Sequence, residues 1–327
     1  MKENSLGKLW EKLQTRTNDL TKYLSLISII ILIVLFSILN ANFFGISNIK
    51  NILMDISPLL VMSCGVACTI FLGSIDLSIG SIASCAAVIL TVLLKETGGT
   101  AYIIVAIYGL LAGLLNGILH TVLKVPSFIA TLSTQCIWQS AAFIISGGMP
   151  LAMLPDTWPF VAWAKISLGP IPLMFLIALV VMLTYFIIQS RTTTGKTILA
   201  IGANEKAARL IGLKITKAKI VAFTLSGLGA AVGGIFFAAK LKSGIPTVGE
   251  QYTLMAIASS VLGGISLSGG KGTIPMTLLG VCLITVIQNG MNVVAVDGLW
   301  QQIVFGALVL CAIYLNSDRT RKSLVVK

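Results

Sequence analysis

The chain has 327 residues, of which 56% are hydrophobic and only 10% are charged. Soluble domains carry about 25% charged residues, so this composition excludes an ordinary soluble protein and indicates an all-α, polytopic membrane protein. The formal net charge is +12, but no region is expected to interleave basic residues with exposed aromatic ones, so we expect no binding of nucleic acid. The positive charges are expected to orient the chain in the lipid bilayer instead.

The six cysteines all lie in apolar segments, and none forms a Cys-x-x-Cys motif. Because the chain also has a single histidine, the usual soft ligands cannot assemble a metal site. We interpret the cysteines as small packing residues and expect no metal or cofactor bound by this chain.

Apolar runs long enough to cross the bilayer follow a polar N-terminal segment, residues 1–22. This segment shows no cleavage pattern, so the first apolar run is expected to remain as an anchor. A helix needs about 20 residues to cross ~30 Å of hydrocarbon, and about ten runs within a single transmembrane domain, residues 23–315, meet this need. The predicted spans are residues 23–40, 52–72, 77–94, 101–123, 126–145, 171–189, 220–239, 252–270, 273–294 and 299–315. The third and the eighth are the weakest candidates for full spans.

The distribution of Lys and Arg predicts the topology. With ten spans and a cytoplasmic N-terminus, 18 of the 23 Lys and Arg lie inside and five lie outside. Because cytoplasmic loops carry the excess of Lys and Arg, both terminal segments, residues 1–22 and 316–327, are expected in the cytoplasm. The longest outside connection runs from Ser146 to Pro170. It closes over an outer vestibule, meets an external partner, or lies at the membrane interface as a plain loop.

The loop between the sixth and seventh spans, residues 190–219, is the most basic part of the chain. It carries seven Lys and Arg against a single acid, Glu205, so it is expected in the cytoplasm. Asn204 has the side chain of a helix N-cap, Glu205 suits the first turn, and Gly212 suits the end of a helix. The pattern therefore predicts a short amphipathic helix lying across the membrane face.

This predicted helix carries one apolar ridge, formed by Ala207, Ala208, Leu210 and Ile211. An apolar ridge of this kind can rest on the protein's own bundle or on anionic lipid headgroups. It can equally dock a cytosolic partner. At this point both interpretations stay open.

Three predicted spans carry polar residues on one helical face. Unpaired polar groups in hydrocarbon cost several kcal/mol, so these side chains must meet each other, a cavity or water. Neutral amides and a tryptophan suit a pathway for an uncharged polyol, whereas interhelical packing is the alternative, and Gly109, Gly113 and Gly117 permit close helix approach. The candidate pathway residues are Asn116 and His120 in the fourth span, Gln135, Trp138 and Gln139 in the fifth, and Gln288, Asn289 and Asn292 in the ninth.

The ionisable residues within or beside the spans are Asp55, Asp76 and His120. Both acids are predicted near span ends, where a charge costs little, and His120 is interpreted as a helix-end hydrogen-bonding residue. A proton-coupled carrier usually needs buried acids or a charge relay within its helices, and the sequence offers neither.

Residues Gly264 to Thr273 look like a phosphate-binding loop. However, Lys271 follows Gly264 by seven residues where that motif needs six, and the segment joins two apolar helices instead of a strand and a helix. We therefore expect no ATP bound by this chain.

Several motifs resemble those of the monosaccharide permeases of ABC importers, the group for ribose, xylose, arabinose and galactosides. Residues 73–81 resemble the signature after the second span, residues 195–212 the cytoplasmic coupling segment, and residues 261–272 a third hallmark. Residues 289–292 match the family as well, and the motifs occur in the family's order. The motif residues are Asp76, Ser78, Gly80, Gly263, Gly264, Gly270 and Lys271.

The resemblance implies a pair of permease subunits, identical or homologous, in the bacterial cytoplasmic (inner) membrane. It also implies a cytosolic ABC ATPase that binds ATP and Mg²⁺, and an extracytoplasmic binding protein that delivers a sugar-like substrate. Which sugar is carried stays open. By the resemblance, the contact with the ATPase is formed by Asn204, Glu205, Ala207, Ala208, Arg209 and Gly212.

The motifs therefore favour the membrane subunit of an ATP-driven importer for a monosaccharide or a similar small polar solute. An ATP-independent secondary carrier or facilitator is the alternative, and it would need intramembrane ion ligands or a relay. An intramembrane enzyme would need paired carboxylates, a metal set or a nucleophile with a base, and the sequence shows none of them.

Overall fold

A computed structural model describes residues 27–316, with side chains described for residues 27–310. The predicted N-terminal segment, the first residues of the first span and the tail beyond Asn316 lie outside the described residues. The helices are Ile27–Leu39, α2 (Ile46–Ile70), α3 (Ile79–Thr97), α4 (Ala101–Thr121), α5 (Ser127–Ser146), α6 (Trp158–Val161), α7 (Leu173–Arg191), α8 (Thr193–Ala203), α9 (Glu205–Leu210), α10 (Ile215–Leu241), α11 (Glu250–Leu262), α12 (Ile274–Val293) and α13 (Gly298–Asn316).

Strands make up very little of the described chain. They form two antiparallel pairs of two residues each, in which Leu151 faces Gly244 and Ser167 faces Pro172. The strands are β1 (Leu151–Ala152), β2 (Ser167–Leu168), β3 (Ile171–Pro172) and β4 (Ser243–Gly244), and 3-10 turns lie at η1 (Ala41–Phe44), η2 (Gly98–Thr100), η3 (Pro155–Thr157) and η4 (Ala162–Lys165).

The predicted all-α polytopic fold is confirmed. By length and composition, six helical stretches among the described residues could cross a membrane, and one of them is the continuous run Ile79–Thr121 that contains α3 and α4. The helix Ile27–Leu39 and α13 add further apolar helices. The total of ten spans and the sides of the two termini stay predictions.

The eighth predicted span, residues 252–270, is wrong in its C-terminal part. α11 has 13 residues and ends at Leu262, and residues 263–273 form an irregular connection to α12. Four glycines of this connection have φ angles between 75° and 118°, and these angles are incompatible with a right-handed helix. The other predicted spans agree with helices to within a few residues, with two exceptions. α2 begins earlier, at Ile46, and α10 begins earlier, at Ile215. Both start before the predicted span because a helix can continue into the polar region beyond the hydrocarbon.

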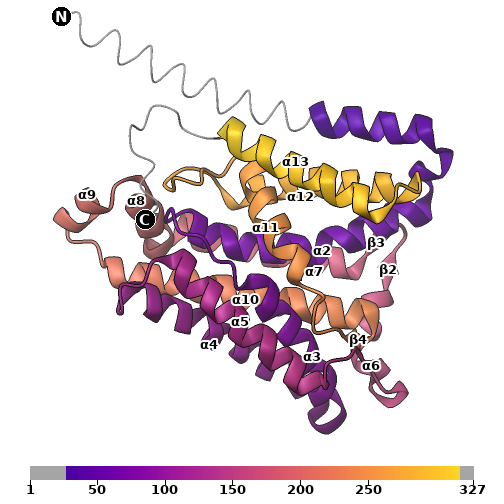
Figure 1. The fold of residues 1–327 in the computed structure, drawn as a ribbon, viewed down its shortest axis with the longest axis horizontal. Helices are drawn as coiled ribbons and strands as arrows, with labels where there is room; N and C mark the ends of the chain where they lie inside the picture. The colour runs from indigo at the N-terminus through magenta and orange to yellow at the C-terminus, as the bar shows by residue number, and fades with distance from the viewer. Residues whose placement is uncertain (1–26, 317–327) are drawn as a thin grey trace, which may run out of the picture.

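α10 is the central helix of the bundle and packs against α2, α3 and α4 (Figure 1). A Cβ added to Gly227 would overlap the carbonyl oxygen of Gly109 and lie 2.6 Å from the backbone nitrogen of Gly113. On another face of α10, a Cβ added to Gly229 would lie 2.9 Å from the Cα of Gly65. The helices therefore touch backbone to backbone, and the close approach predicted for the fourth span is confirmed.

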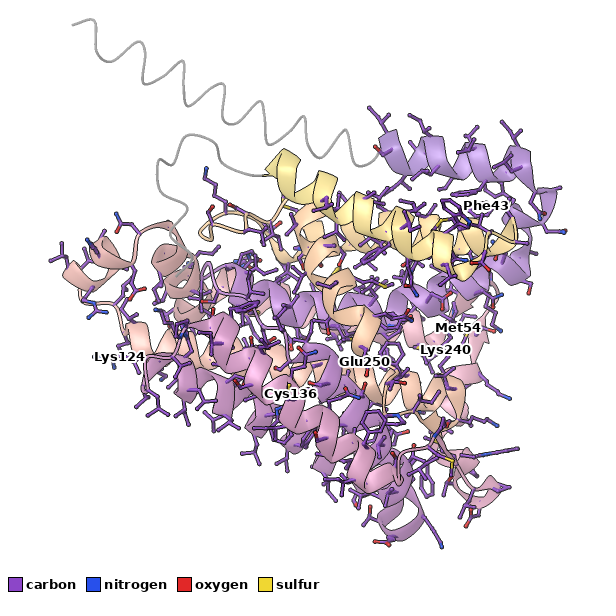
Figure 2. All side chains as sticks on the ribbon, viewed as in Figure 1. Phe43, Met54, Lys124, Cys136, Lys240 and Glu250 are labelled. Atoms are coloured by element: carbon purple, nitrogen blue, oxygen red, sulfur yellow. The ribbon has the colours of Figure 1, made fainter. Side chains whose placement is uncertain are left out.

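The two ends of the bundle are differently built. α8 and α9 cover one end, whereas α6 and the four short strands lie at the other (Figure 1). Lys124 and Lys240, labelled in Figure 2, lie towards these two ends, and Lys240 forms an ion pair with Asp55. The basic loop and the longest outside connection thus lie at opposite ends of the molecule, as the predicted topology requires.

The connection between α5 and α7 is folded onto the bundle. The indole nitrogen of Trp163 donates to the hydroxyl of Tyr102 at 3.0 Å, and that hydroxyl donates to the carbonyl oxygen of Phe160 at 2.8 Å. The ammonium group of Lys242 lies 3.4 Å from the ring centre of Trp158, a cation–π contact. These contacts fix the connection to α4 and to the end of α10.

We expect the substitution Gly227→Ala to destabilise the protein by about 1–3 kcal/mol, because the added methyl group has no space between α4 and α10. The matched control is Gly306→Ala on α13, where an added Cβ meets no atom within 4 Å and alanine favours the helix. Thermal unfolding of both variants in the same detergent measures the difference. Equal melting temperatures for the two variants would contradict the backbone contact.

Candidate functional site

α9 begins and ends as the sequence predicts. The side-chain oxygen of Asn204 accepts a hydrogen bond from the N–H of Ala207 at 3.1 Å, so Asn204 is the N-cap. After α9, the N–H of Leu213 donates to the carbonyl oxygen of Ala208 at 3.1 Å. Gly212 has a φ angle of +79°, which favours glycine and ends the helix.

The predicted apolar ridge of α9 is divided between two environments. Ala208 is 2% exposed and packs inward, whereas Leu210 and Ile211 are 88% and 74% exposed. Ala207 is also exposed. The end of α9 therefore presents two large apolar side chains that contact little of the protein's own bundle.

Glu205 ties α9 to α10. Its carboxylate lies 2.9 Å from the ammonium group of Lys219 on α10 and 3.3 Å from the guanidinium of Arg209 one turn further along α9. Lys219 is largely covered, whereas Arg209 is exposed, so the bond to Lys219 is the less screened of the two. Glu205 thus serves as an anchor within the chain, and Arg209 is accessible.

The sequence pattern predicts no helix before Asn204 in this loop, but the structure forms α8 there. The hydroxyl oxygen of Thr192 accepts a hydrogen bond from the N–H of Gly195 at 3.1 Å and caps the helix. A Cβ on Gly195 would overlap the backbone of α7, so a glycine is needed where the chain turns sharply from α7 into α8. The threonine before an apolar pattern was the sequence signal for this helix.

The end of α8 meets two other connections in a junction of glycines. The N–H of Gly270 donates to the carbonyl oxygen of Phe71 at 2.9 Å. A Cβ on Gly202 would overlap that same carbonyl oxygen and lie 2.5 Å from the nitrogen of Gly270. A Cβ on Gly269 would lie 2.6 Å from the nitrogen of Gly73. The three family-like motifs, distant in sequence, therefore meet at the end of α8, just before α9 begins. We call this contact the glycine junction.

Gln189, near the end of α7, extends the glycine junction to α12. Its amide nitrogen donates to the carbonyl oxygen of Gly272 at 3.0 Å, and its amide oxygen accepts from the N–H of Ile274 at 2.8 Å. Gln189 is buried, and it satisfies two backbone groups at the start of α12. A lone glutamine at the end of a hydrophobic run gives no sequence signal for this role.

Asp76 is not at a solvated span end, contrary to the expectation from sequence. It is 0% exposed, because the chain leaves α2 at Ile70 and runs through the bundle before α3 begins at Ile79. Its carboxylate accepts hydrogen bonds from the N–H and hydroxyl of Ser78, at 3.0 and 2.6 Å, and from the hydroxyl of Ser226, at 2.7 Å. Burial raises the pKa of Asp76, and these hydrogen bonds oppose the rise.

Asn116, a candidate pathway residue, belongs to the same buried network. Its amide nitrogen donates to the hydroxyl of Ser78 at 2.7 Å, and its amide oxygen accepts from the hydroxyl of Thr134 at 2.6 Å. The network links the start of α3 with α4, α5 and α10. All these polar groups have partners, so here the side chain of Asn116 contributes to helix packing.

The other candidate residues of the fourth and fifth spans lie along α4 and α5. The Nδ1 of His120 lies 3.0 Å from the carbonyl oxygen of Val125, a helix-end hydrogen bond. Trp138 stacks edge-on against Tyr108, with ring centres 5.3 Å apart, and the amide of Gln139 donates to the carbonyl oxygen of Pro246 at 2.8 Å. Gln135 is partly exposed.

The candidates of the ninth span form a separate group on α12, which packs on α2, α7 and α11, whereas α5 packs on α3 and α4. Gln288 donates to the sulfur of Met255 at 3.4 Å, Asn289 bonds with Asn48, and Asn292 is exposed. The structure therefore does not bring the two groups of candidates together within one chain. Their use in a pathway stays a prediction.

The remaining motif residues mostly serve close packing. A Cβ on Gly80 would overlap the backbone of Gly249, and one on Gly263 would overlap the carbonyl oxygen of Met276. Gly264 has a φ angle of +106°. Lys271 is exposed beside the glycine junction. The segment that resembled a phosphate-binding loop joins α11 to α12 and supports α8 instead.

Residues 48–313 match the family described as the branched-chain amino acid transport system / permease component. The chain belongs to this permease family. The match includes α9, the glycine junction and the Asp76 network.

Relatives of this permease include the ribose import permease proteins RbsC of Bacillus subtilis and Escherichia coli K12. Each is 33% identical to this chain. Both alignments cover 90% of this chain, and they cover 92% and 93% of the length of the two relatives, respectively. The L-arabinose transport system permease protein AraH of Escherichia coli K12 is 32% identical over 95% of this chain and 92% of its own length.

We expect the substitution Gln189→Met in the permease to lower the free energy of unfolding by about 2–4 kcal/mol. The buried N–H of Ile274 would lose its partner at about 1–3 kcal/mol, and the half-buried carbonyl oxygen of Gly272 would lose its partner at a smaller cost. Gln251→Met, at an exposed glutamine on α11, is the matched control and should cost less than about 0.5 kcal/mol. Unfolding in mixed micelles measures both, and a variant at residue 189 as stable as the control would refute the bridging role.

Proposed function

We propose that this permease is the membrane subunit of an ATP-driven importer of a monosaccharide or a similar uncharged polar solute, with a ribose-like sugar as the first candidate. The relatives named for ribose and L-arabinose transport align over nine-tenths of this chain. The observation that carries the proposal is that Leu210 and Ile211, at the end of α9, are exposed, while the end of α8 just before α9 is held in the glycine junction.

A helix of this kind can transmit force. A partner that binds Leu210 and Ile211 would move α9 and, with it, α8. Through the glycine junction, α8 would then displace the connection after α2 and residues 263–273. Gln189 continues the contact to the start of α12. Because the contacts are between backbones, little movement would be lost in side-chain rearrangement.

The proposed partner at α9 is a cytosolic ABC ATPase, which would supply the site for ATP and Mg²⁺. Its two nucleotide states must differ in affinity for the two permease conformations, since contact alone cannot drive a change. A second permease subunit and an extracytoplasmic binding protein complete the proposed complex in the bacterial cytoplasmic membrane, with α8 and α9 on the inside.

We expect the double substitution Leu210→Ser and Ile211→Ser to leave the melting temperature of the isolated permease unchanged, because both side chains are exposed. ATP-driven uptake in proteoliposomes with the ATPase and the binding protein should fall more than tenfold. The reason is that truncating an apolar residue buried at the centre of an interface costs about 2 kcal/mol or more of binding free energy. These residues test docking more cleanly than Glu205 does, because Glu205 also bonds to α10.

Leu183→Ser, at a leucine that is 52% exposed in the middle of α7, away from both ends of the bundle, serves as the control and should leave uptake intact. Undiminished uptake by the double variant would refute docking at α9. Uptake of the solute by the purified permease alone, without any ATPase, would instead support a secondary carrier.

A further inference from the structure

Amide side chains from opposite ends of the chain gather where α12 ends. The amides of Asn48 on α2 and Asn289 on α12 bond to each other reciprocally, at 2.9 and 3.0 Å. The amide of Asn40 donates to the carbonyl oxygen of Val293 at 2.9 Å, just before α2. The amides on one face of the ninth predicted span therefore meet a second group of asparagines, which lies at and just before the start of α2.

This amide cluster is held rigidly. Phe43, labelled in Figure 2, is buried beneath the turn before α2 and belongs to an apolar cluster with Phe36, Val286 and Met291. The amide of Asn48 also donates to the carbonyl oxygen of Phe43 at 2.9 Å. The turn that carries the asparagines is thus fixed to α12 by both apolar and polar contacts.

A hollow of about 330 Å³ opens beside the Asn48–Asn289 pair. It is lined by Asn42, Gly45, Ser47, Asn48, Asn51 and Val293. The volume is enough for a small solute. None of the lining side chains is ionisable, and Asn42, Ser47 and Asn51 are exposed, so their polar groups can reach a solute in the hollow.

The polar groups open to the hollow are all neutral. The amides of Asn42 and Asn51 and the hydroxyl of Ser47 both donate and accept hydrogen bonds, and none of the lining side chains carries a charge.

Neutral donors and acceptors match hydroxyl groups, because each hydroxyl both donates and accepts. A zwitterionic amino acid carries a full ammonium and a full carboxylate, which are costly to desolvate without charged partners. The lining therefore favours an uncharged polyol over a branched-chain amino acid, although the family description names the latter.

We propose that this hollow is a binding site for an uncharged monosaccharide at the outer end of the permease. The site rests on the proposed function and specifies the solute chemistry that its outer end recognises. Lys50, next to the hollow in sequence, donates to the hydroxyl of Ser167 at 2.9 Å. The site therefore lies at the end that carries the strands β2 and β3, opposite α9 (Figure 1).

The test uses the full-length permease in nanodiscs, with D-ribose, L-arabinose and leucine as probes in saturation-transfer NMR. We expect saturable binding of at least one of the two sugars and none of leucine. The double substitution Asn42→Leu and Asn51→Leu should raise the sugar's Kd at least tenfold, and the milder Asn51→Gln should raise it less. Gln302→Leu, at an exposed glutamine of α13 outside the hollow, should leave binding unchanged.

Thermal unfolding of each variant shows that it is folded. Binding of neither sugar, binding of leucine in place of a sugar, or sugar binding that the double variant keeps would overturn the site. ATP-driven uptake by the wild-type complex is measured separately. Normal sugar uptake with unchanged binding in the double variant would reject this site alone, whereas absence of ATP-driven sugar uptake by the wild-type complex would reject the proposed function.

Discussion

Direct contact between backbones is the constraint on which the rest of the structure depends. Where Gly227 meets Gly109 and Gly113, and where Gly202 meets Phe71 and Gly270, no side chain separates the two segments. In hydrocarbon the hydrophobic effect cannot drive helices together, so close packing and hydrogen bonds must hold them. Glycines serve both needs, because they let polar backbone atoms of neighbouring segments come within contact distance.

Backbone contacts join segments at both ends of the permease. At the end that carries α9, this helix is joined to α10 by the Glu205–Lys219 bond, and α8, just before it, meets the connection after α2 and residues 263–273 in the glycine junction. At the other end, the backbone pairing of β1 with β4 and the bond from Trp163 to Tyr102 hold the connection between α5 and α7. Segments joined through their backbones move together, whereas a side-chain contact such as the Trp163–Tyr102 bond can rearrange by rotation about single bonds.

The sequence predicts those features that depend on composition or on neighbouring residues. Hydropathy gives the helices, and the local cap pattern gives Asn204 and Gly212 correctly. Prediction from the sequence fails where a residue acts on a distant segment. Gln189 and Asp76 look like isolated polar residues near span ends, and only the fold shows that one bridges to α12 and the other is enclosed by hydroxyl groups. Hydropathy does not predict the end of α11 at Leu262, because no charged residue interrupts the segment between Leu262 and Lys271.

Polar groups within an apolar bundle can be fully paired or left open, and the two conditions have different consequences. The amide of Asn116 is enclosed between Ser78 and Thr134, and a solute could reach it only by breaking those bonds and leaving their partners unpaired. Asn42 and Asn51 are exposed at the edge of a hollow, so a solute there would replace water and not protein. Burial, more than residue type, therefore separates amides that stabilise the bundle from amides that can recognise what crosses it.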